Sequence, residues 1–193
     1  MPYRVEDYQT ALEQHPDVAR RIGIIFGLYV MIEYELVPTL RWIANVSPEQ
    51  ALVALETHKT FSGKIAYIKA VCDVEQADWP RDADVGRAFA AAALAASKIR
   101  NKYAHATYGW RGDPAPAPAM EQLFVRVQTN RLGGVVREEA ATIQQLDAEM
   151  HFMKSLIVAM KNYAAAREAT LPVDQQEIVQ LSKQVPRLLG EAT

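Results

Sequence analysis

The chain has 193 residues, of which 50% are hydrophobic and 23% are charged, and its formal net charge is -2 at pH 7. This composition is ordinary for a globular protein, and it excludes a disordered or fibrous chain and a protein that coats nucleic acid through overall positive charge. The length suits one domain, residues 1–193, with a proper hydrophobic core.

The cysteine content and the N-terminal sequence bear on compartment and metal content. Cys72 is the single cysteine, so an internal disulfide is excluded, and a structural zinc site is not expected. Charges interrupt the first ten residues, which argues against a signal peptide. The longest apolar run, Ile22 to Ile32, is shorter than the roughly 20 residues that a membrane-spanning helix needs. We therefore expect a cytoplasmic protein with no membrane segment, no metal and no cofactor.

A long buried helix is predicted from Asp17 to Ala44, because apolar residues recur on nearly every turn. Ser47 followed by proline is the next break in this pattern. Pro38 lies inside the pattern, where its missing amide and its ring predict a kink or an end of the helix near Val37.

A second helix is predicted to begin at Ser47-Pro48, which offers a capping hydroxyl and a first-turn proline, and to run to about Cys72. Gly63 would weaken its middle or let another helix approach closely. Residues 73–81 are expected to form a polar loop. The expected buried stripe of this helix is Leu52, Leu55, Ile65, Ile68 and Val71.

An alanine-rich stretch that lacks proline follows Asp84 and predicts a long helix through at least Tyr103, with Ile99 and Tyr103 on a stripe that suits the core. Its small side chains would let a neighbouring helix pack tightly. Residues 112–138 are expected to form a proline-alanine linker and a small β-hairpin insertion, because an alternating segment, a glycine-containing turn and a second apolar segment follow one another.

The last long helix is predicted from about Thr142 to Glu168, and residues 171–193 are expected to form a tail with one short helix. The predicted fold class is therefore all-α, a bundle of four to five main helices with a small β-hairpin insertion. The inner face expected for the last helix consists of Ile143, Leu146, Met150, Met153, Leu156, Ile157 and Met160.

Chemistry is concentrated in the stretch SKIRNKYAHATYGW, residues 97–110. On a regular helix Asn101 and His105 are neighbours and Tyr108 lies near the same row, whereas Arg100 and His105 diverge by roughly 140°. Arg100 and His105 can converge if the helix tightens near its end or if a second chain supplies the missing half. This geometry indicates dimerisation.

The residue types in this stretch suit phosphate chemistry. The Arg100 guanidinium can hold two phosphate oxygens at once, and the His105 imidazole can give or take a proton at cellular pH. Asn101 can position a ribose or phosphate oxygen, or orient the imidazole. RNA carries its own nucleophile, the 2′-hydroxyl, so proton transfer and charge stabilisation are sufficient for cleavage without a metal ion.

The segment RNKYAH, Arg100 to His105, resembles the motif of HEPN domains, in which an arginine, a polar residue and a three-residue spacer precede a histidine. The segment Ile22 to Leu40 is similar to the first core helix of that family, with Ile32, Glu33 and Leu36 in the matching positions. The resemblance covers roughly residues 18–108 and the helix after residue 142. Members often have glycine after the histidine, where this chain has Ala106, and the pose of His105 depends on that difference.

The resemblance implies a helical bundle that forms a two-fold homodimer, with two motifs facing one cleft. It also implies metal-independent endoribonuclease activity that leaves a 2′,3′-cyclic phosphate and a 5′-hydroxyl. Many members are toxins or defence components, so RNA is the expected substrate and an antitoxin or another protein is a possible partner. Arg100, Asn101 and His105 match the family's catalytic positions.

Three further residues are candidates for supporting roles. Glu33 and Glu35 sit in an apolar helix, where one of them is expected to need a cation. Pairing of Glu33 with Arg100 is one hypothesis, either to tune the site or for structure alone. Lys98, with Lys102 and Arg111, could form a basic rim for RNA, although charges beside a helix end are usually solvated.

Tyr108 and Trp110 could stack on bases, although such aromatic residues more often close a core. Glu35 is expected to be solvated.

Two other readings of the motif stay open. His105 could simply complement the dipole at a helix C-terminus, which is worth about 0.3 to 1 kcal/mol without any catalysis. The chain would then be either a non-catalytic HEPN-like module that binds a nucleotide, RNA or a protein partner, or a purely structural helical dimer. In the structural dimer His105 could be changed without functional loss.

Overall fold

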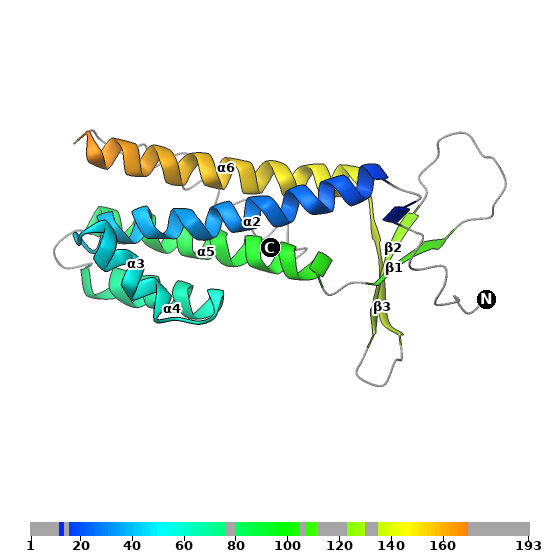
Figure 1. Ribbon diagram of the computed structural model, residues 1–193, viewed down its shortest axis with the longest axis horizontal. Coiled ribbons are helices and arrows are strands. Elements are labelled where there is room, and N and C mark those ends of the chain that lie inside the picture. The colour runs from blue at the N-terminus through cyan, green and yellow to red at the C-terminus, as the bar shows by residue number, and fades with distance from the viewer. Residues whose placement is uncertain are drawn as a thin grey trace. The chain divides into compact units, whose positions relative to one another are not determined.

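The computed structural model describes residues 12–13, 16–75, 80–104, 107–111, 123–129 and 135–169. In this part of the chain the long elements are helices, so the helical character of the predicted fold is shown (Figure 1). The helices are α2 (Pro16–Ile43), α3 (Pro48–Glu56), α4 (Phe61–Glu75), α5 (Pro80–Ala104) and α6 (Ile143–Glu168), and the strands are β1 (Thr107–Arg111), β2 (Leu123–Thr129) and β3 (Val135–Ala141).

The chain divides into two compact units. Residues 1–26 and 100–150 form one unit, which contains the strands and which we call the sheet unit. Residues 27–99 and 151–193 form the other, which we call the helical unit.

The core of the helical unit is made by residues of α2, α3, α4, α5 and α6. Phe89 of α5 packs against Tyr163 of α6 with ring centroids 5.7 Å apart, and Tyr29 of α2 packs against Phe61 of α4 at 5.0 Å. The alanine-rich side of α5 is buried, as its composition predicts, because small side chains let neighbouring helices come close. The buried alanines of α5 are Ala83, Ala90, Ala92, Ala93, Ala95 and Ala96.

The helices approach closely at Gly86 of α5. A Cβ atom added there would lie 2.5 Å from Sγ of Cys72 and 2.5 Å from Cδ1 of Ile43, so α2, α4 and α5 meet at this point. Of the two roles expected for Gly63, a close helix approach is not what its nearest neighbours show. A Cβ atom at Gly63 would meet Oγ1 of Thr60 at 3.1 Å and Cβ of His58 at 3.4 Å, both just before it in the chain.

Helix α2 runs without interruption through Pro38 to Ile43. Of the predicted kink or end near Val37, the end is therefore wrong, and the kink stays a prediction. The amide that proline lacks would have bonded the carbonyl of Tyr34, a residue that is 73% exposed and therefore open to water. The Thr39 hydroxyl donates to the Glu35 carbonyl at 2.7 Å in the next position. The helix ends where Asn45 adopts a positive φ of 50°, a conformation that suits asparagine after a helix C-terminus.

The single helix predicted from residue 48 to Cys72 is two helices in the structure, α3 and α4. Thr57 donates its hydroxyl to the Ala54 carbonyl at 2.6 Å, and the Thr60 hydroxyl accepts from the Gly63 amide at 3.1 Å. These local bonds offer the backbone an alternative to continued helix. The predicted start is confirmed, because Ser47 and Gln50 form a capping box.

The buried stripe expected for this region is confirmed in part. Leu55, Ile65 and Ile68 are buried, but Leu52 is 44% exposed, because the break turns α3 independently of α4. On α6 the predicted inner face is confirmed except at its first residue, since Ile143 is 42% exposed. The buried residues of that face are Leu146, Met150, Met153, Leu156, Ile157 and Met160.

The sheet unit contains one antiparallel sheet with the strand order β1-β2-β3. Thr107 pairs with Val127 and Arg111 with Leu123, and the β2–β3 register is irregular at Gln128/Thr129. Strand β2 and the first part of β3 fall within residues 112–138, and the hairpin insertion itself stays a prediction. The predicted linker after residue 112 and the predicted tail helix lie outside the described residues.

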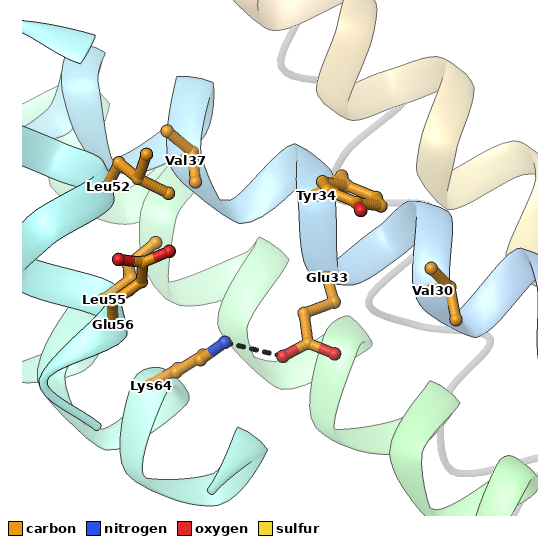
Figure 2. Close-up of a pocket in the computed structure, with 8 residues that line it drawn as sticks. All are labelled: Val30, Glu33, Tyr34, Val37, Leu52, Leu55, Glu56 and Lys64. Atoms are coloured by element: carbon orange, nitrogen blue, oxygen red, sulfur yellow. Dashed lines mark hydrogen bonds and ion pairs between the residues drawn. The ribbon is translucent and has the colours of Figure 1, made fainter. Parts of the chain in front are cut away.

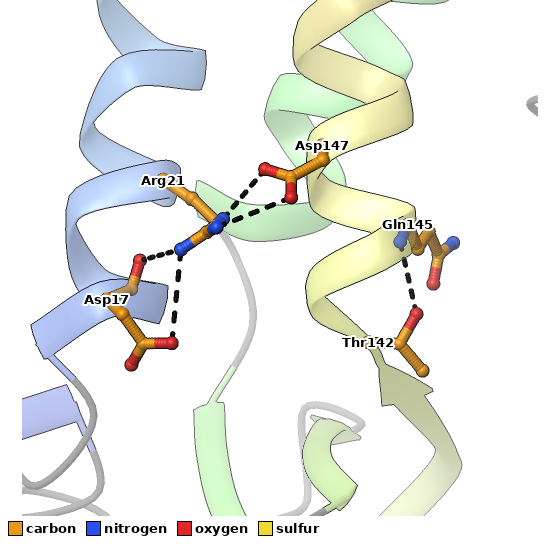
Figure 3. A network of polar contacts seen from close by, with 5 residues as sticks. All are labelled: Asp17, Arg21, Thr142, Gln145 and Asp147. Atoms are coloured by element: carbon orange, nitrogen blue, oxygen red, sulfur yellow. Dashed lines mark hydrogen bonds and ion pairs between the residues drawn. The ribbon is translucent and has the colours of Figure 1, made fainter. Parts of the chain in front are cut away.

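Polar contacts join the starts of α2 and α6 within the sheet unit (Figure 3). Arg21 donates to both carboxylate oxygens of Asp147, from Nε at 2.8 Å and from Nη2 at 3.3 Å, and also to the Asp17 carbonyl at 3.2 Å. Thr142 caps α6, since its hydroxyl accepts from the Gln145 amide at 3.1 Å. The predicted start of the last helix is therefore confirmed.

Helix α2 is long and apolar enough to cross a membrane by length and composition, with a mean hydropathy of 1.4 over its most apolar 18 residues. Of that window, 28% is buried within the protein. Core helices of soluble proteins and signal sequences pass the same test, so this property of α2 is weak evidence for a membrane location.

Candidate functional site

The last described turn of α5 carries Arg100 and Asn101, and their side chains touch. Nη1 of Arg100 donates to Oδ1 of Asn101 at 2.9 Å. The Arg100 guanidinium also lies over the ring of Phe26, with its carbon 5.9 Å from the ring centroid. A planar guanidinium can stack on an aromatic ring and, at the same time, donate hydrogen bonds in its own plane. The two contacts together restrict its orientation.

The third motif residue, His105, lies outside the described residues. Helix α5 ends at Ala104, and His105 is the next residue along the chain. Strand β1 begins at Thr107, and within it Tyr108 is opposite Arg126 in the β1–β2 register. The placement of Tyr108 on the helical row of Asn101 is therefore wrong, because the chain has left the helix before it reaches Tyr108.

Behind the motif lies a buried carboxylate that the sequence interpretation missed. Glu149 of α6 is 1% exposed, and its Oε2 accepts from the Tyr103 hydroxyl at 2.5 Å, while its Oε1 is 2.9 Å from Nζ of Lys102. Gln145 contributes a longer contact of 3.5 Å to the same Oε1. The sequence does contain a signal for it. Glu149 comes three residues after Leu146 and so falls on the predicted inner face of the last helix, where a carboxylate needs polar partners.

The two lysines near the motif have different environments. Lys102 belongs to the Glu149 cluster, and its side chain is only 17% exposed, so its assignment to a solvated basic rim is wrong. Lys98 is exposed and stays a candidate for that rim. Ile99 and Tyr103 are 1% and 2% exposed, which confirms the predicted core stripe of this helix.

The cation that Glu33 needs is Lys64 of α4. Nζ of Lys64 lies 2.6 Å from Oε1 of Glu33, and both side chains are partly buried, at 20% and 35% exposed. The pairing of Glu33 with Arg100 stays a hypothesis, and Lys64 already supplies Glu33 with one cation. The expectation that Glu35 is solvated is also wrong, because its side chain is 16% exposed and lies 3.7 Å from Nζ of Lys161.

A second polar cluster joins α5 to α6 in the helical unit. Asp82 is 7% exposed and accepts from the Tyr163 hydroxyl at 3.2 Å, while Nη2 of Arg167 lies 3.0 Å from its other oxygen. Burial, followed by the charge of Asp82 and the hydrogen bond to it, raises the pKa of Tyr163 above its ordinary value. Tyr163 therefore stays protonated and acts as a donor, which makes this cluster structural.

Within the residues that the structure describes, no three histidine, cysteine, aspartate or glutamate side chains gather as metal ligands would. Burial raises the pKa of the Cys72 thiol to about 11, and this side chain is 0% exposed. Reactive cysteines have a lowered pKa and solvent access, so Cys72 is not a candidate nucleophile.

Comparison of the chain with protein-family models, with curated proteins and with solved structures finds no match.

Proposed function

We propose that this protein is a HEPN-like, metal-independent endoribonuclease that acts as a cytoplasmic homodimer, as a toxin or defence component. The proposal rests on the RNKYAH motif and on one observation above all, the contact between Arg100 and Asn101 at the end of α5. A guanidinium whose orientation is restricted before substrate binds needs little reorganisation when charge develops on a phosphate.

In the proposed reaction, one histidine accepts the proton of the ribose 2′-hydroxyl, and the 2′-oxygen attacks phosphorus. The bond from phosphorus to the 5′-oxygen breaks, and a second histidine protonates that oxygen. The products are a 2′,3′-cyclic phosphate and a 5′-hydroxyl. Arg100 stabilises the extra charge on the phosphoryl oxygens, and Asn101 holds Arg100. The two histidines are the two copies of His105 in a dimer, because each chain supplies one motif.

The test is cleavage of labelled RNA in EDTA by the wild-type protein and by Arg100→Ala and His105→Ala. Matched controls are Arg20→Ala and His151→Ala, because both residues are exposed. We expect the wild type and both controls to cleave, and each motif variant to lose at least about 100-fold in rate. Product ends should be a cyclic phosphate and a 5′-hydroxyl.

Cleavage that survives both motif substitutions would contradict the proposal, and so would a wild type that cleaves no RNA tested. A wild type that binds RNA through Arg100 without cleaving it would instead support the non-catalytic module. The molecular mass in solution is an independent check, because a monomer at assay concentrations is incompatible with a shared cleft.

A further inference from the structure

The helical unit has a groove between α2 and α3, away from the RNKYAH motif in sequence (Figure 2). Its cavity volume is about 250 Å³. We define this α2–α3 groove by its apolar and acidic walls, which are Val30, Tyr34 and Val37 of α2 and Leu52, Leu55 and Glu56 of α3. The Glu33–Lys64 ion pair also lines it, and Figure 2 shows Lys64 reaching from α4 toward Glu33.

Both walls carry side chains at helical spacing. Val30, Tyr34 and Val37 follow one another by four and three residues, and Leu52, Leu55 and Glu56 lie within one turn of α3. Residues three or four apart form a ridge along a helix. An amphipathic helix that binds in a groove presents apolar side chains at this same spacing.

The groove exposes large apolar side chains. Val30 is 48% exposed, Tyr34 is 73% exposed and Leu52 is 44% exposed. Met31 of α2 and Val53 of α3 are also exposed, at 42% and 62%. Exposed apolar side chains around a hollow with a polar rim are typical of an interaction site.

The charges of the groove indicate what the partner carries. Lys64 neutralises Glu33 at 2.6 Å. Glu56 is exposed, and no cation pairs with it in the described part of the chain. Two carboxylates and one ammonium group therefore leave one negative charge at the rim, and a cation on the partner would complement it.

The size of the cavity favours side chains of a macromolecule over a whole small molecule. Pockets for small ligands usually measure about 300–1,000 Å³. A cavity of about 250 Å³ is small by this measure, and it is open to solvent. It suits a few side chains of a longer partner.

We propose that the α2–α3 groove binds an amphipathic helix of a partner protein. Apolar residues one turn apart on that helix enter between Tyr34 and Leu52, and a lysine or arginine beside them pairs with Glu56. This inference is independent of the proposed ribonuclease activity, because it uses other residues and a binding assay.

The test selects a displayed library of amphipathic helical peptides on the full-length protein, without RNA. Enriched peptides are synthesised with a fluorescent label, and their Kd is measured by anisotropy. We expect the peptides to share two apolar residues at i and i+3 or i+4, with a lysine or arginine within one turn. Leu52→Asp should weaken binding at least tenfold, whereas the control Val158→Asp, at a residue of α6 that is 50% exposed, should not.

Charge exchange tests the role of Glu56. Glu56→Lys should weaken binding of the cationic peptide at least tenfold, and replacing the peptide's lysine with glutamate should restore binding to that variant. Leu52 and Glu56 are exposed, so both variants are expected to fold, and circular dichroism checks this.

Several results would overturn the inference. No enriched peptide, equal binding to Leu52→Asp, or the same charge preference in Glu56→Lys would each do so. Self-association that Leu52→Asp abolishes in sedimentation would assign the groove to a second copy of this chain. Binding to phosphatidylglycerol vesicles that Leu52→Asp abolishes would assign it to a lipid surface.

Discussion

Tyr103 donates its phenolic hydrogen to the carboxylate of Glu149 at 2.5 Å, and the two residues are 2% and 1% exposed. The other carboxylate oxygen lies 2.9 Å from the ammonium group of Lys102. Arg100 and Asn101 precede these two partners directly along α5. A buried carboxylate on α6 thus holds the helical turn that carries the candidate site.

The first prediction concerns the stability that Glu149 contributes. Removing one partner of a buried ion pair leaves the other charge poorly solvated, so Glu149→Ala should lower the free energy of unfolding by about 3–5 kcal/mol. Glu149→Gln should lower it less, because the amide oxygen still accepts from Tyr103. Urea unfolding followed by circular dichroism measures both.

The matched control is Glu168→Ala on the same helix, where the residue is exposed, and we expect a change within about 0.5 kcal/mol. A loss below about 1 kcal/mol for Glu149→Ala would show that the cluster does not hold α5.

The second prediction concerns Asn101 and rests on the proposed function. Asn101→Ala removes the acceptor at 2.9 Å from Arg100, so we expect about a tenfold loss in kcat/KM for RNA cleavage. Asn101→Asp places a negative charge beside Arg100 and the substrate phosphate, and we expect a loss of about 100-fold or more. Steady-state kinetics measures both, with Asn162→Asp, at an exposed residue of α6, as control. Equal activity of all three variants would remove Asn101 from the site.

The third prediction concerns the helix contact at Gly86. Gly86→Ala places a Cβ atom 2.5 Å from both Cys72 and Ile43, which are themselves buried. Overpacking lowers the free energy of unfolding by about 1–3 kcal/mol, whereas the higher helix propensity of alanine raises it by about 1 kcal/mol. Because the clash has partners on two helices, we expect a net loss of about 2 kcal/mol in unfolding free energy.

Gly27→Ala is the control for this substitution, since a Cβ atom there meets nothing within 4 Å. It should stabilise the protein by about 0.5–1 kcal/mol through helix propensity alone. Adding Ile43→Val to Gly86→Ala removes Cδ1 and should recover part of the loss. The same sign of effect for both glycine substitutions would contradict the close approach.

The fourth prediction concerns alkaline pH. Burial raises the pKa of Cys72 from 9.0 to about 11, so the folded protein keeps this proton when the unfolded chain has lost it. The contribution of the protonated Cys72 thiol to the free energy of unfolding is fully present below pH 9 and is lost as the pH rises from 9 to 11. The free energy of unfolding should fall in this window by up to about 1.4 kcal/mol per pH unit for this group.

Unfolding measured at pH 8, 9 and 10 for the wild type and Cys72→Ala checks this expectation. The variant should be less stable throughout, because it leaves a cavity, but its stability should decline less steeply between pH 9 and 10. Tyr163 adds its own decline in both proteins only near and above its ordinary pKa of 10.0. Identical slopes would show that the Cys72 thiol titrates normally.

The sequence predicts the helical elements well where one periodic pattern decides them. Apart from Ile143, the α6 stripe is buried as predicted, and so is the stripe of Ile99 and Tyr103, because the 3.6-residue period determines which side is apolar. One pattern continued across residues 57–60 predicts a buried Leu52, but threonine hydroxyls at Thr57 and Thr60 divide this region into two separate helices. Local hydrogen bonding of this kind competes with periodicity, and composition does not reveal the outcome.

The candidate site is determined by the sequence only in part. The adjacency of Arg100 and Asn101 on one helical turn, and the need of Glu33 for a cation, follow from residue type and helix geometry. Which partner each charge takes depends on segments distant in the chain. Lys64 reaches Glu33, and Glu149 reaches Lys102 and Tyr103 across 47 and 46 residues.

By itself, therefore, the sequence determined the helical class, the apolar stripes and the RNKYAH motif, because these depend on neighbours within about two helical turns. Only the tertiary structure decided the ion pairs, the close helix approach at Gly86 and the α2–α3 groove. Each of these requires groups from different helices to come within a few ångströms, and packing of the whole chain, not local spacing, sets those distances.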